Sequence, residues 1–419
     1  MVEPLAILTS DVAEVVPTDG LQGKLALGRP LRVKLGLDPT APAVTLGWAV
    51  VLRKLRQFQD LGHTAILIVG DFTARVGDPS GRSQTRPRLS KEEVDGYAER
   101  LLQQFRMVLS SERLEVRRNS EWLEPMDMEA ILHLTASTTV ARMLERDDFA
   151  NRYEQRQPIS LTEFMYPLLQ GSDSVAVGAD VELGGTDQLF NLLVGRDLQR
   201  DAGQEPQIAL TMPLLEGLDG VQKMSQSVGN YVGIAEPADD QFGKLMSIPD
   251  ALIARYLRLT TGLDPAEVDA IETGLAAGSL RAVEGKRRLA REIVDLYHGG
   301  GEGAAAQERF DRVHRDRALP RDVPETPIPK EALESGTVWL PRLLVSLGRA
   351  ASNGEARRLV EQGGVRLDGE VVTDPSLELA PEELDGTVLQ VGRRWFTRLS
   401  KTSISAGHRP EVDAPVPET

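Results

Sequence analysis

Residues 31–69 read LRVKLGLDPTAPAVTLGWAVVLRKLRQFQDLGHTAILIV, and this stretch decides the fold class. Its start, 31–37, alternates apolar and basic side chains and ends at a turn rich in proline and glycine. From residue 48 to 61 the apolar residues recur at helical spacing, and the run AILIV at 65–69 is typical of a buried parallel strand. The order strand, turn, helix, strand predicts a β-α-β unit with a right-handed crossover.

The chain alternates between sheet and helix on either side of this unit. Residues 88–160 have the amphipathic spacing of helices, whereas VAVGADVELGGTDQ at 175–188 predicts a second stretch of parallel sheet. Residues 236–316 are predicted to be helical, with HGGGEGAAA at 298–306 as a flexible loop. The proline-rich residues 318–336 resemble an interdomain linker, and the polar tail from 402 to 419 is expected to be disordered.

Composition narrows the possible chemistry. The 419 residues include no cysteine and five widely separated histidines, which argues against disulfides, thiolate chemistry and a zinc cluster. The sequence has no apolar run of about 18 residues and no basic, apolar leader, so we expect neither a membrane span nor a signal peptide. A cytoplasmic enzyme is the resulting expectation. The net charge of −15 argues against nonspecific binding of nucleic acid.

Three glycine-rich turns follow strand-like segments and open helices, and each carries an aspartate, namely Asp38, Asp78 and Asp187. Such turns suit phosphate groups, because backbone N–H groups and a helix N-terminus point at the ligand there. A single turn of this kind is often only a turn. Three in one predicted domain indicate a nucleotide site.

Two further clusters are candidates for ligand binding, each with a structural alternative. Lys223, Ser225 and Ser227 lie in the polar loop GLDGVQKMSQSVGN, which suits phosphate oxygens but is also typical of a solvated turn. Tyr166, Gln170 and Asp173 share one helical face, which suits a small polar ligand or a buried hydrogen-bond network.

The segment 338–401 has a different charge balance from the rest of the chain. It holds nine basic and nine acidic residues, whereas the whole chain has a net charge of −15. Its arginines, which include Arg349, Arg357, Arg358 and Arg366, suit contact with RNA phosphates. The alternative interpretation is that these arginines are ordinary charged residues on the solvent-facing sides of helices.

Together these segments resemble the bacterial tyrosyl-tRNA synthetases, which are class I aminoacyl-tRNA synthetases. The resemblance covers about Gly28 to Ser400 and is carried by VLRKLRQFQDLGH, GDPSGR, EFMYPLLQ, ADVELGGTDQ and GLDGVQKMS. The segment GEARRLVEQGGVRLDGE is similar to an S4-type RNA-binding domain.

The resemblance implies an α/β fold with three folded parts. These are a Rossmann-like parallel-sheet catalytic domain at 1–230 with a helical dimerisation insertion at about 110–160, an α-helical anticodon-binding-like domain at 231–318, and an S4-like α+β domain at 338–401 after a linker at 319–337. It also implies a homodimer, through the amphipathic residues 123–147.

The implied reaction has two steps: tyrosine attacks ATP to give tyrosyl-adenylate, and the tyrosyl group then passes to tRNA(Tyr). ATP is a substrate, with Mg²⁺ bridging its phosphates rather than held by a protein cage. The implied catalytic residues are Lys223, Ser225, Ser227, Thr40 and Thr45. The implied tyrosine-binding residues are Gly36, Asp38, Asp78, Tyr166, Gln170, Asp173 and Gln188, and those for ATP are Thr40, Gly47, Trp48, Asp187 and Lys223. RNA would meet Arg349, Arg357, Arg358 and Arg366.

The chain departs from the family at both signature motifs. The first signature, His-(Ile/Leu)-Gly-His, reads Thr45-Leu46-Gly47-Trp48, and the second, Lys-Met-Ser-Lys-Ser, has Gln226 in place of its second lysine. Ser172 stands where an aromatic residue is common. The amino-acid pocket is thus kept while the groups facing the ATP phosphates differ. Besides a tyrosine–tRNA ligase with impaired activation, the sequence leaves two alternatives: a diverged paralogue that binds or activates tyrosine or an analogue outside translation, for example in secondary metabolism, and a non-catalytic protein that binds RNA or a partner.

Overall fold

The computed structural model describes residues 4–79, 89–314, 323–334, 336–392 and 395–401. The chain divides into two compact units, Met1–Gln307 and Glu308–Thr419, each considered by itself below. The tail at 402–419 and part of the GDPSGR turn lie outside the described residues.

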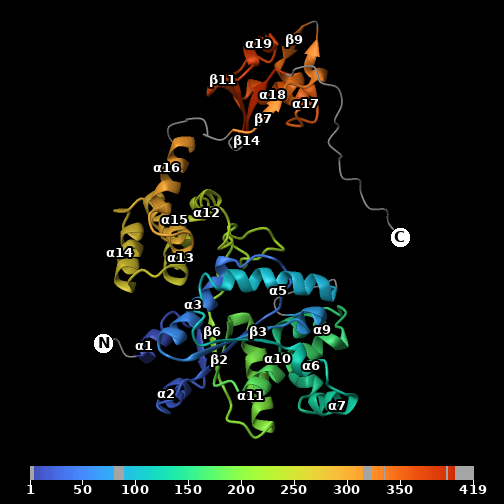
Figure 1. Cartoon of the computed structure of the whole chain (residues 1–419), viewed down its shortest axis with the longest axis vertical. Coiled ribbons are helices and arrows are strands. Elements are labelled where there is room, and N and C mark those ends of the chain that lie inside the picture. Colours follow the sequence, from blue (N-terminus) through green and yellow to red (C-terminus); the bar gives the residue numbers. More distant parts are fainter. Residues whose placement is uncertain (1–3, 80–88, 315–322, 335, 393–394, 402–419) are drawn as a thin grey trace. The chain divides into compact units, whose positions relative to one another are not determined.

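The first unit is built on a six-stranded sheet in the order β1-β6-β5-β2-β3-β4 (Figure 1). All neighbouring strands are parallel except β1, which runs antiparallel to β6 at one edge. Chain order runs outward from β2 through β3 to β4 on one side and through β5 to β6 on the other. The topology therefore reverses between β2 and β5, where open α/β sheets bind their ligands. The strands are β1 (Glu14–Val16), β2 (Arg32–Leu37), β3 (Thr64–Val69), β4 (Leu114–Arg118), β5 (Val181–Gly185) and β6 (Ile208–Met212).

The predicted β-α-β unit is β2, α3 and β3, in which five of the six residues of β3 are buried. Helices then cover the sheet and fill the predicted helical region. They are α1 (Pro4–Thr9), α2 (Gly20–Leu25), α3 (Leu46–Asp60), α4 (Thr73–Val76), α5 (Lys91–Phe105), α6 (Ser120–Leu123), α7 (Met128–Ala136), α8 (Val140–Met143), α9 (Asp147–Glu154), α10 (Leu161–Val177), η1 (Thr186–Gln188) and α11 (Leu189–Asp201).

Helices α10 and α11 lie side by side, which fixes the wall that carries Gln170 and Asp173 (Figure 1). Glycines permit this close approach: a Cβ at Gly171 would lie 2.7 Å from Leu198 Cδ1 and 3.3 Å from Gly195 Cα. A capping box between Ser160 and Glu163 starts α10.

Two local predictions for this unit were wrong. Residues 114–118 lie in the stretch expected to be mostly helical but form the edge strand β4, paired with β3. Of the expected loop at 298–306, the residues from Glu302 onward are helical, so the break between α15 and α16 is the short glycine run 299–301. Alanines after the glycines favour helix once the chain has turned.

A group of helices follows the sheet, as expected for 236–316. They are α12 (Ala238–Met246), η2 (Asp250–Leu252), α13 (Ile253–Thr260), α14 (Pro265–Ala276), α15 (Ala282–His298) and α16 (Glu302–His314) (Figure 1). Helix α15 packs against α12 and α13 through a buried face that includes Leu289, Ile293 and Val294.

The second unit is a small α+β fold with its own core. Its five-stranded sheet has the order β11-β10-β13-β14-β7, and a three-stranded sheet has the order β12-β9-β8. Its elements are β7 (Glu325–Pro327), η3 (Lys330–Ala332), β8 (Leu333–Glu334), β9 (Thr337–Trp339), α17 (Leu340–Ser346), α18 (Asn353–Glu361), β10 (Val365–Leu367), β11 (Glu370–Val372), β12 (Glu378–Leu379), α19 (Pro381–Leu384), β13 (Val388–Val391) and β14 (Trp395–Ser400).

Part of the expected linker at 319–337 belongs to this second fold. Strand β7 pairs in parallel with β14, and Ile328 and Ala332 lie in the buried core with Leu340, Leu343 and Val360. The apolar residues between the prolines, such as Ile328, were the sequence feature that could have predicted a folded segment here. None of the helices in the described residues combines the length and apolar character that crossing a membrane requires.

Candidate active site

A cavity of about 410 Å³ lies at the carboxyl ends of β2, β3 and β5, at the reversal of strand order. Every residue that the sequence assigns to tyrosine binding, ATP binding or catalysis lines it. They are Gly36, Asp38, Thr40, Thr45, Gly47, Trp48, Asp78, Tyr166, Gln170, Asp173, Asp187, Gln188, Lys223, Ser225 and Ser227. The residues come from separate stretches of chain, so the fold alone brings them together.

Asp38, directly after β2, is held by two hydroxyl groups. Tyr166 donates its phenol proton to Asp38 Oδ2 at 3.0 Å, and Thr73 Oγ1 donates to Oδ1 at 2.6 Å. Burial and the nearby Asp38 carboxylate raise the pKa of Tyr166 well above its usual value, so the phenol stays a donor. Gly70 makes room for this arrangement, because a Cβ there would lie 2.1 Å from Asp38 Oδ1.

Asp78 and Gln188 belong to a second group of polar contacts on the cavity wall. Gln188 Nε2 donates to Asp78 Oδ2 at 2.9 Å, and the Arg146 guanidinium lies 3.7 Å from Asp78 Oδ1. Asn191 Nδ2 donates to the side-chain oxygens of Gln170 and Gln188, each at 3.0 Å. Sequence reasoning missed Arg146 and Asn191, because they lie in segments that carry no motif.

Asp173 is the most buried carboxylate that lines the cavity, 3% exposed, and we call its end of the cavity the inner end. Trp122 Nε1 donates a hydrogen bond of 2.9 Å to its Oδ1 atom. Burial raises the pKa of the Asp173 carboxyl to about 7, against the opposing influence of the Lys34 charge. A group so placed accepts a hydrogen bond from a ligand hydroxyl readily, since the bond partly replaces the lost solvation.

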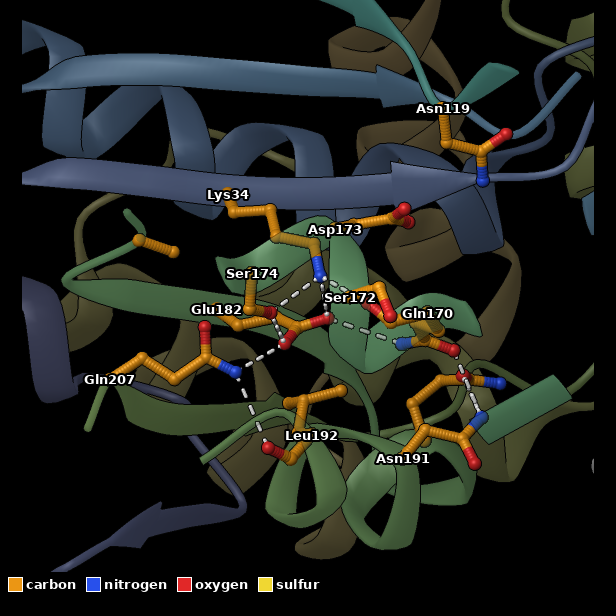
Figure 2. A network of polar contacts seen from close by, with 12 residues as sticks. Lys34, Asn119, Gln170, Ser172, Asp173, Ser174, Glu182, Asn191, Leu192 and Gln207 are labelled. Carbon is orange, nitrogen blue, oxygen red and sulfur yellow. Dashed lines mark hydrogen bonds and ion pairs between the residues drawn. The ribbon is translucent and has the colours of Figure 1, made fainter. Parts of the chain in front are cut away.

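Behind this wall lies a buried ion pair that the sequence did not suggest. Lys34 Nζ is 2.9 Å from Glu182 Oε1, and the two side chains are 0% and 1% exposed (Figure 2). The same ammonium donates to Ser174 Oγ at 2.7 Å and to the Gln170 carbonyl at 3.0 Å. Gln170 Nε2 in turn donates to Glu182 Oε1 at 3.2 Å. The network therefore fixes both the backbone and the carboxamide of Gln170.

The first departure from the family signature lies at the start of α3. Thr45 is the N-cap: its Oγ1 accepts from Trp48 N at 3.3 Å. The Trp48 side chain lines the cavity and is 36% exposed. Thr45 thus keeps a hydrogen-bonding role at the helix end, while Trp48 presents an indole ring.

The second signature segment packs against the first. Lys223 Nζ is 2.7 Å from Asp187 Oδ2, and the hydroxyls of Ser225 and Ser227 lie 2.9 Å apart. Gln226, which also lines the cavity, is hydrogen-bonded to the backbone of Ala43. Among the described residues, no group of three or more His, Asp or Glu side chains is arranged to hold a metal ion by itself.

The arginines assigned to RNA lie on the second unit, and three of the four are exposed. Arg349 and Arg357 stack on Trp395 and Trp339, with ring-centre distances of 4.8 and 4.9 Å. Arg358 is exposed on α18, and the half-buried Arg366 donates to the Gly369 carbonyl at 3.0 Å.

A family model described as tRNA synthetases class I (W and Y) matches residues 26–315. The chain belongs to the class I tRNA synthetases. An S4 domain model also matches residues 338–385 of this synthetase. The tyrosine–tRNA ligase of Moorella thermoacetica is 54% identical over 399 residues, which are 94% of this chain and 95% of the relative. That of Geobacter sulfurreducens is 49% identical over 402 residues, 95% of this chain and 98% of the relative.

Solved synthetase structures share the fold. A C-terminally truncated mitochondrial tyrosyl-tRNA synthetase of Aspergillus nidulans has a TM-score of 0.62 at 22% identity, covering 75% of this chain and 94% of that one. The Archaeoglobus fulgidus tyrosyl-tRNA synthetase with L-tyrosine has a TM-score of 0.60 at 21% identity, covering 72% and 98%. The predicted fold class and family are confirmed.

Proposed function

We propose that this synthetase is a tyrosine–tRNA ligase. A carboxylate oxygen of L-tyrosine attacks the α-phosphorus of ATP, the bond to the bridging oxygen of the β-phosphate breaks, and pyrophosphate leaves. A hydroxyl of the terminal ribose of tRNA(Tyr) then attacks the acyl carbon of tyrosyl-adenylate, the bond to the phosphate oxygen breaks, and AMP leaves. Such chemistry depends chiefly on positioning and on stabilising phosphate charge.

The observation that carries the proposal is the polarity of the cavity from its inner end outward. Asp173 is a buried acceptor for the phenol hydroxyl, whereas Asp78, Gln170 and Tyr166 offer oxygens to the ammonium. Gln188 lies beside them. A phenylalanine side chain would leave Asp173 without that donor. Sites left unpaired in this way discriminate strongly, and tyrosyl-tRNA synthetases are themselves the known example of the effect.

The outer part of the cavity suits ATP. Lys223 and the hydroxyls of Ser225 and Ser227 would contact the phosphates together with Thr40 and Thr45, and Asp187 would accept from ribose hydroxyls. Gly47 and Trp48 would border the nucleotide. Mg²⁺ would enter bound to ATP and offset phosphate charge, since this ion is commonly held by substrate phosphates and few protein ligands.

The remaining parts of the chain serve tRNA and assembly in this proposal. The helices from 238 onward would meet the anticodon region, and the S4-like unit would bind RNA phosphates through Arg349, Arg357, Arg358 and Arg366. A homodimer would form through the exposed apolar side chains of α7, and the enzyme would act in the cytoplasm.

Tyrosine-dependent exchange of labelled pyrophosphate into ATP tests the first step, and charging of tRNA(Tyr) tests the second. We expect both, with tyrosine favoured over phenylalanine by at least about 10³-fold in kcat/KM, in keeping with the discrimination known for this enzyme class. Exchange without charging would assign the chain to activation outside translation. Failure of tyrosine to support any exchange would contradict the proposal.

A further inference from the structure

The backbone that leads into α3 is held by two glutamine side chains. Gln104 Nε2 donates to the Pro42 carbonyl at 2.9 Å, and its Oε1 accepts from Val44 N at 2.8 Å. Gln226 Nε2 donates to the Ala43 carbonyl at 2.5 Å, and its Oε1 accepts from Ala43 N at 3.1 Å. Residues 42 and 44 therefore bond to Gln104, and residue 43 between them bonds to Gln226. An extended strand between two neighbouring strands alternates its hydrogen bonds in the same way.

The contact that Gln226 makes suits a carboxamide and not an ammonium group. It donates and accepts at once, whereas a lysine ammonium has three donors and no acceptor. The lysine of the family signature at this position could reach the Ala43 carbonyl but would leave the Ala43 N–H without its acceptor. The substitution therefore exchanges a positive charge for a second hydrogen bond.

We propose that Gln226 is a positioning residue that ties the loop 223–227 to residues 42–44 before ATP binds. The loop is anchored on both sides of this tie. Lys223 reaches Asp187 on one side, and on the other the chain pairs with the start of α3 through Leu46 N and the Val232 carbonyl, at 2.8 Å. Gln226 fixes the middle of the loop, where Ser225 and Ser227 face the cavity.

A loop fixed in this way needs less ordering when the nucleotide arrives. Binding that must immobilise a loop loses affinity to the entropy of ordering, and a pre-organised loop avoids part of that loss. The tie would therefore favour ATP binding, while tyrosine, whose contacts lie deeper in the cavity, would be little affected.

Amide hydrogen exchange resolved to single residues over 40–46 tests the tie without any ligand. We expect Gln226→Met to speed exchange at Ala43 N about tenfold, as loss of one net hydrogen bond allows, and to leave Val44 N within twofold. Gln104→Met should speed exchange at Val44 N about tenfold and leave exchange at Ala43 N within twofold. Gln226→Lys should resemble Gln226→Met. Gln222→Met changes an exposed glutamine directly before the loop and should affect neither amide. Unchanged exchange at Ala43 N in Gln226→Met or Gln226→Lys would overturn the proposal.

The kinetic arm rests on the proposed function. In pyrophosphate exchange, Gln226→Met should raise KM for ATP about five- to tenfold, with KM for tyrosine within twofold of the parent enzyme. Gln222→Met should leave both constants unchanged. Equal rises in both KM values would contradict a positioning role. If the parent enzyme shows no tyrosine-dependent exchange, the proposed function fails, while the amide pattern still decides the tie.

Discussion

Two buried carboxyl groups and one buried ammonium lie at or directly behind the inner end of the cavity. Lys34 pairs with Glu182, and Asp173 is the remaining acid, which Trp122 stabilises with one hydrogen bond. Isolated carboxylates in such surroundings are unfavourable, and the pKa of Asp173 rises to about 7 for that reason. The cavity therefore holds a buried carboxyl group whose charged form is unfavourable despite the hydrogen-bonding influence of Trp122 and Asn119.

This shift makes the stability of the fold depend on pH. The unfolded chain releases the Asp173 proton near its ordinary pKa of about 3.9, and the folded chain near 7, so the native state binds more protons between these values. The contribution of Asp173 to stability is present below about pH 4 and is lost as pH rises through 7. Asp173→Asn should therefore stabilise the fold by about 1–3 kcal/mol at pH 8 relative to its effect at pH 4. Urea unfolding at the two pH values measures this; a pH-independent difference would contradict it.

The Lys34–Glu182 pair should be sensitive to the loss of one partner. Lys34→Met leaves a buried carboxylate without its cation and is expected to destabilise the fold by about 3–5 kcal/mol. Adding Glu182→Gln removes that charge and should recover at least half of the loss. As a control, Arg200→Met breaks a pair with Asp197 in which both side chains are exposed and should cost at most about 1 kcal/mol. A small effect of Lys34→Met in urea unfolding would show that Glu182 takes up a proton instead.

At the scale of elements, the start of α3 and the loop 223–227 carry the departures from the signature motifs. Thr45 caps the helix but cannot carry charge, and Gln226 brings no cation to the phosphates. One transition-state donor is worth about 10²–10³ in rate. We expect weak pyrophosphate exchange in the parent enzyme and, at saturating ATP, at least a tenfold rise when Thr45→His, Trp48→His and Gln226→Lys are combined. No improvement over the parent rate would mean that the present residues serve activation equally well.

Helix α7 carries apolar side chains that face solvent: Met128 is 69% exposed and Leu132 61%. If this helix forms the proposed dimer interface, a charge there must be buried on association. Leu132→Glu should weaken the dimer at least about 100-fold, as seen by sedimentation velocity across a concentration series. Leu27→Glu, at a leucine that is 51% exposed outside α7, should leave the dimer intact. Equal behaviour of the two variants would place the interface elsewhere.

The elements show what the sequence could and could not predict. Strand β3 and helix α3 have strong periodicity, and both were predicted, because their burial follows directly from the pattern. Strand β4, LEVRR, was missed because it lies at an edge, where its Val116 is 42% exposed and charged residues are tolerated. The contact between Gln226 and Ala43 could not be predicted for another reason. It joins residues 183 positions apart, and no local sequence pattern indicates such a contact.

At the scale of the whole molecule, the chain consists of two units that each have their own core. If the second unit binds RNA, replacing both Arg357 and Arg358 with alanine should raise KM for tRNA about tenfold and lower the slope of log affinity against log salt by about one to two. Pyrophosphate exchange should stay unchanged. Arg200→Ala, at an exposed arginine of the first unit, is the control for a general effect of charge. A loss of exchange in the double variant would contradict such a separate role for the second unit.

The ion pair between Lys223 and Asp187 has a consequence for how the free enzyme treats other anions. Asp187 acts as an internal counter-ion, so small anions such as inorganic phosphate must compete with a carboxylate 2.7 Å away from the ammonium. In the proposed function, ATP would bring phosphates to Lys223 and ribose hydroxyls to Asp187, and would satisfy both groups at once. Under that proposal, the pair would favour a nucleotide over a bare anion before any reaction begins.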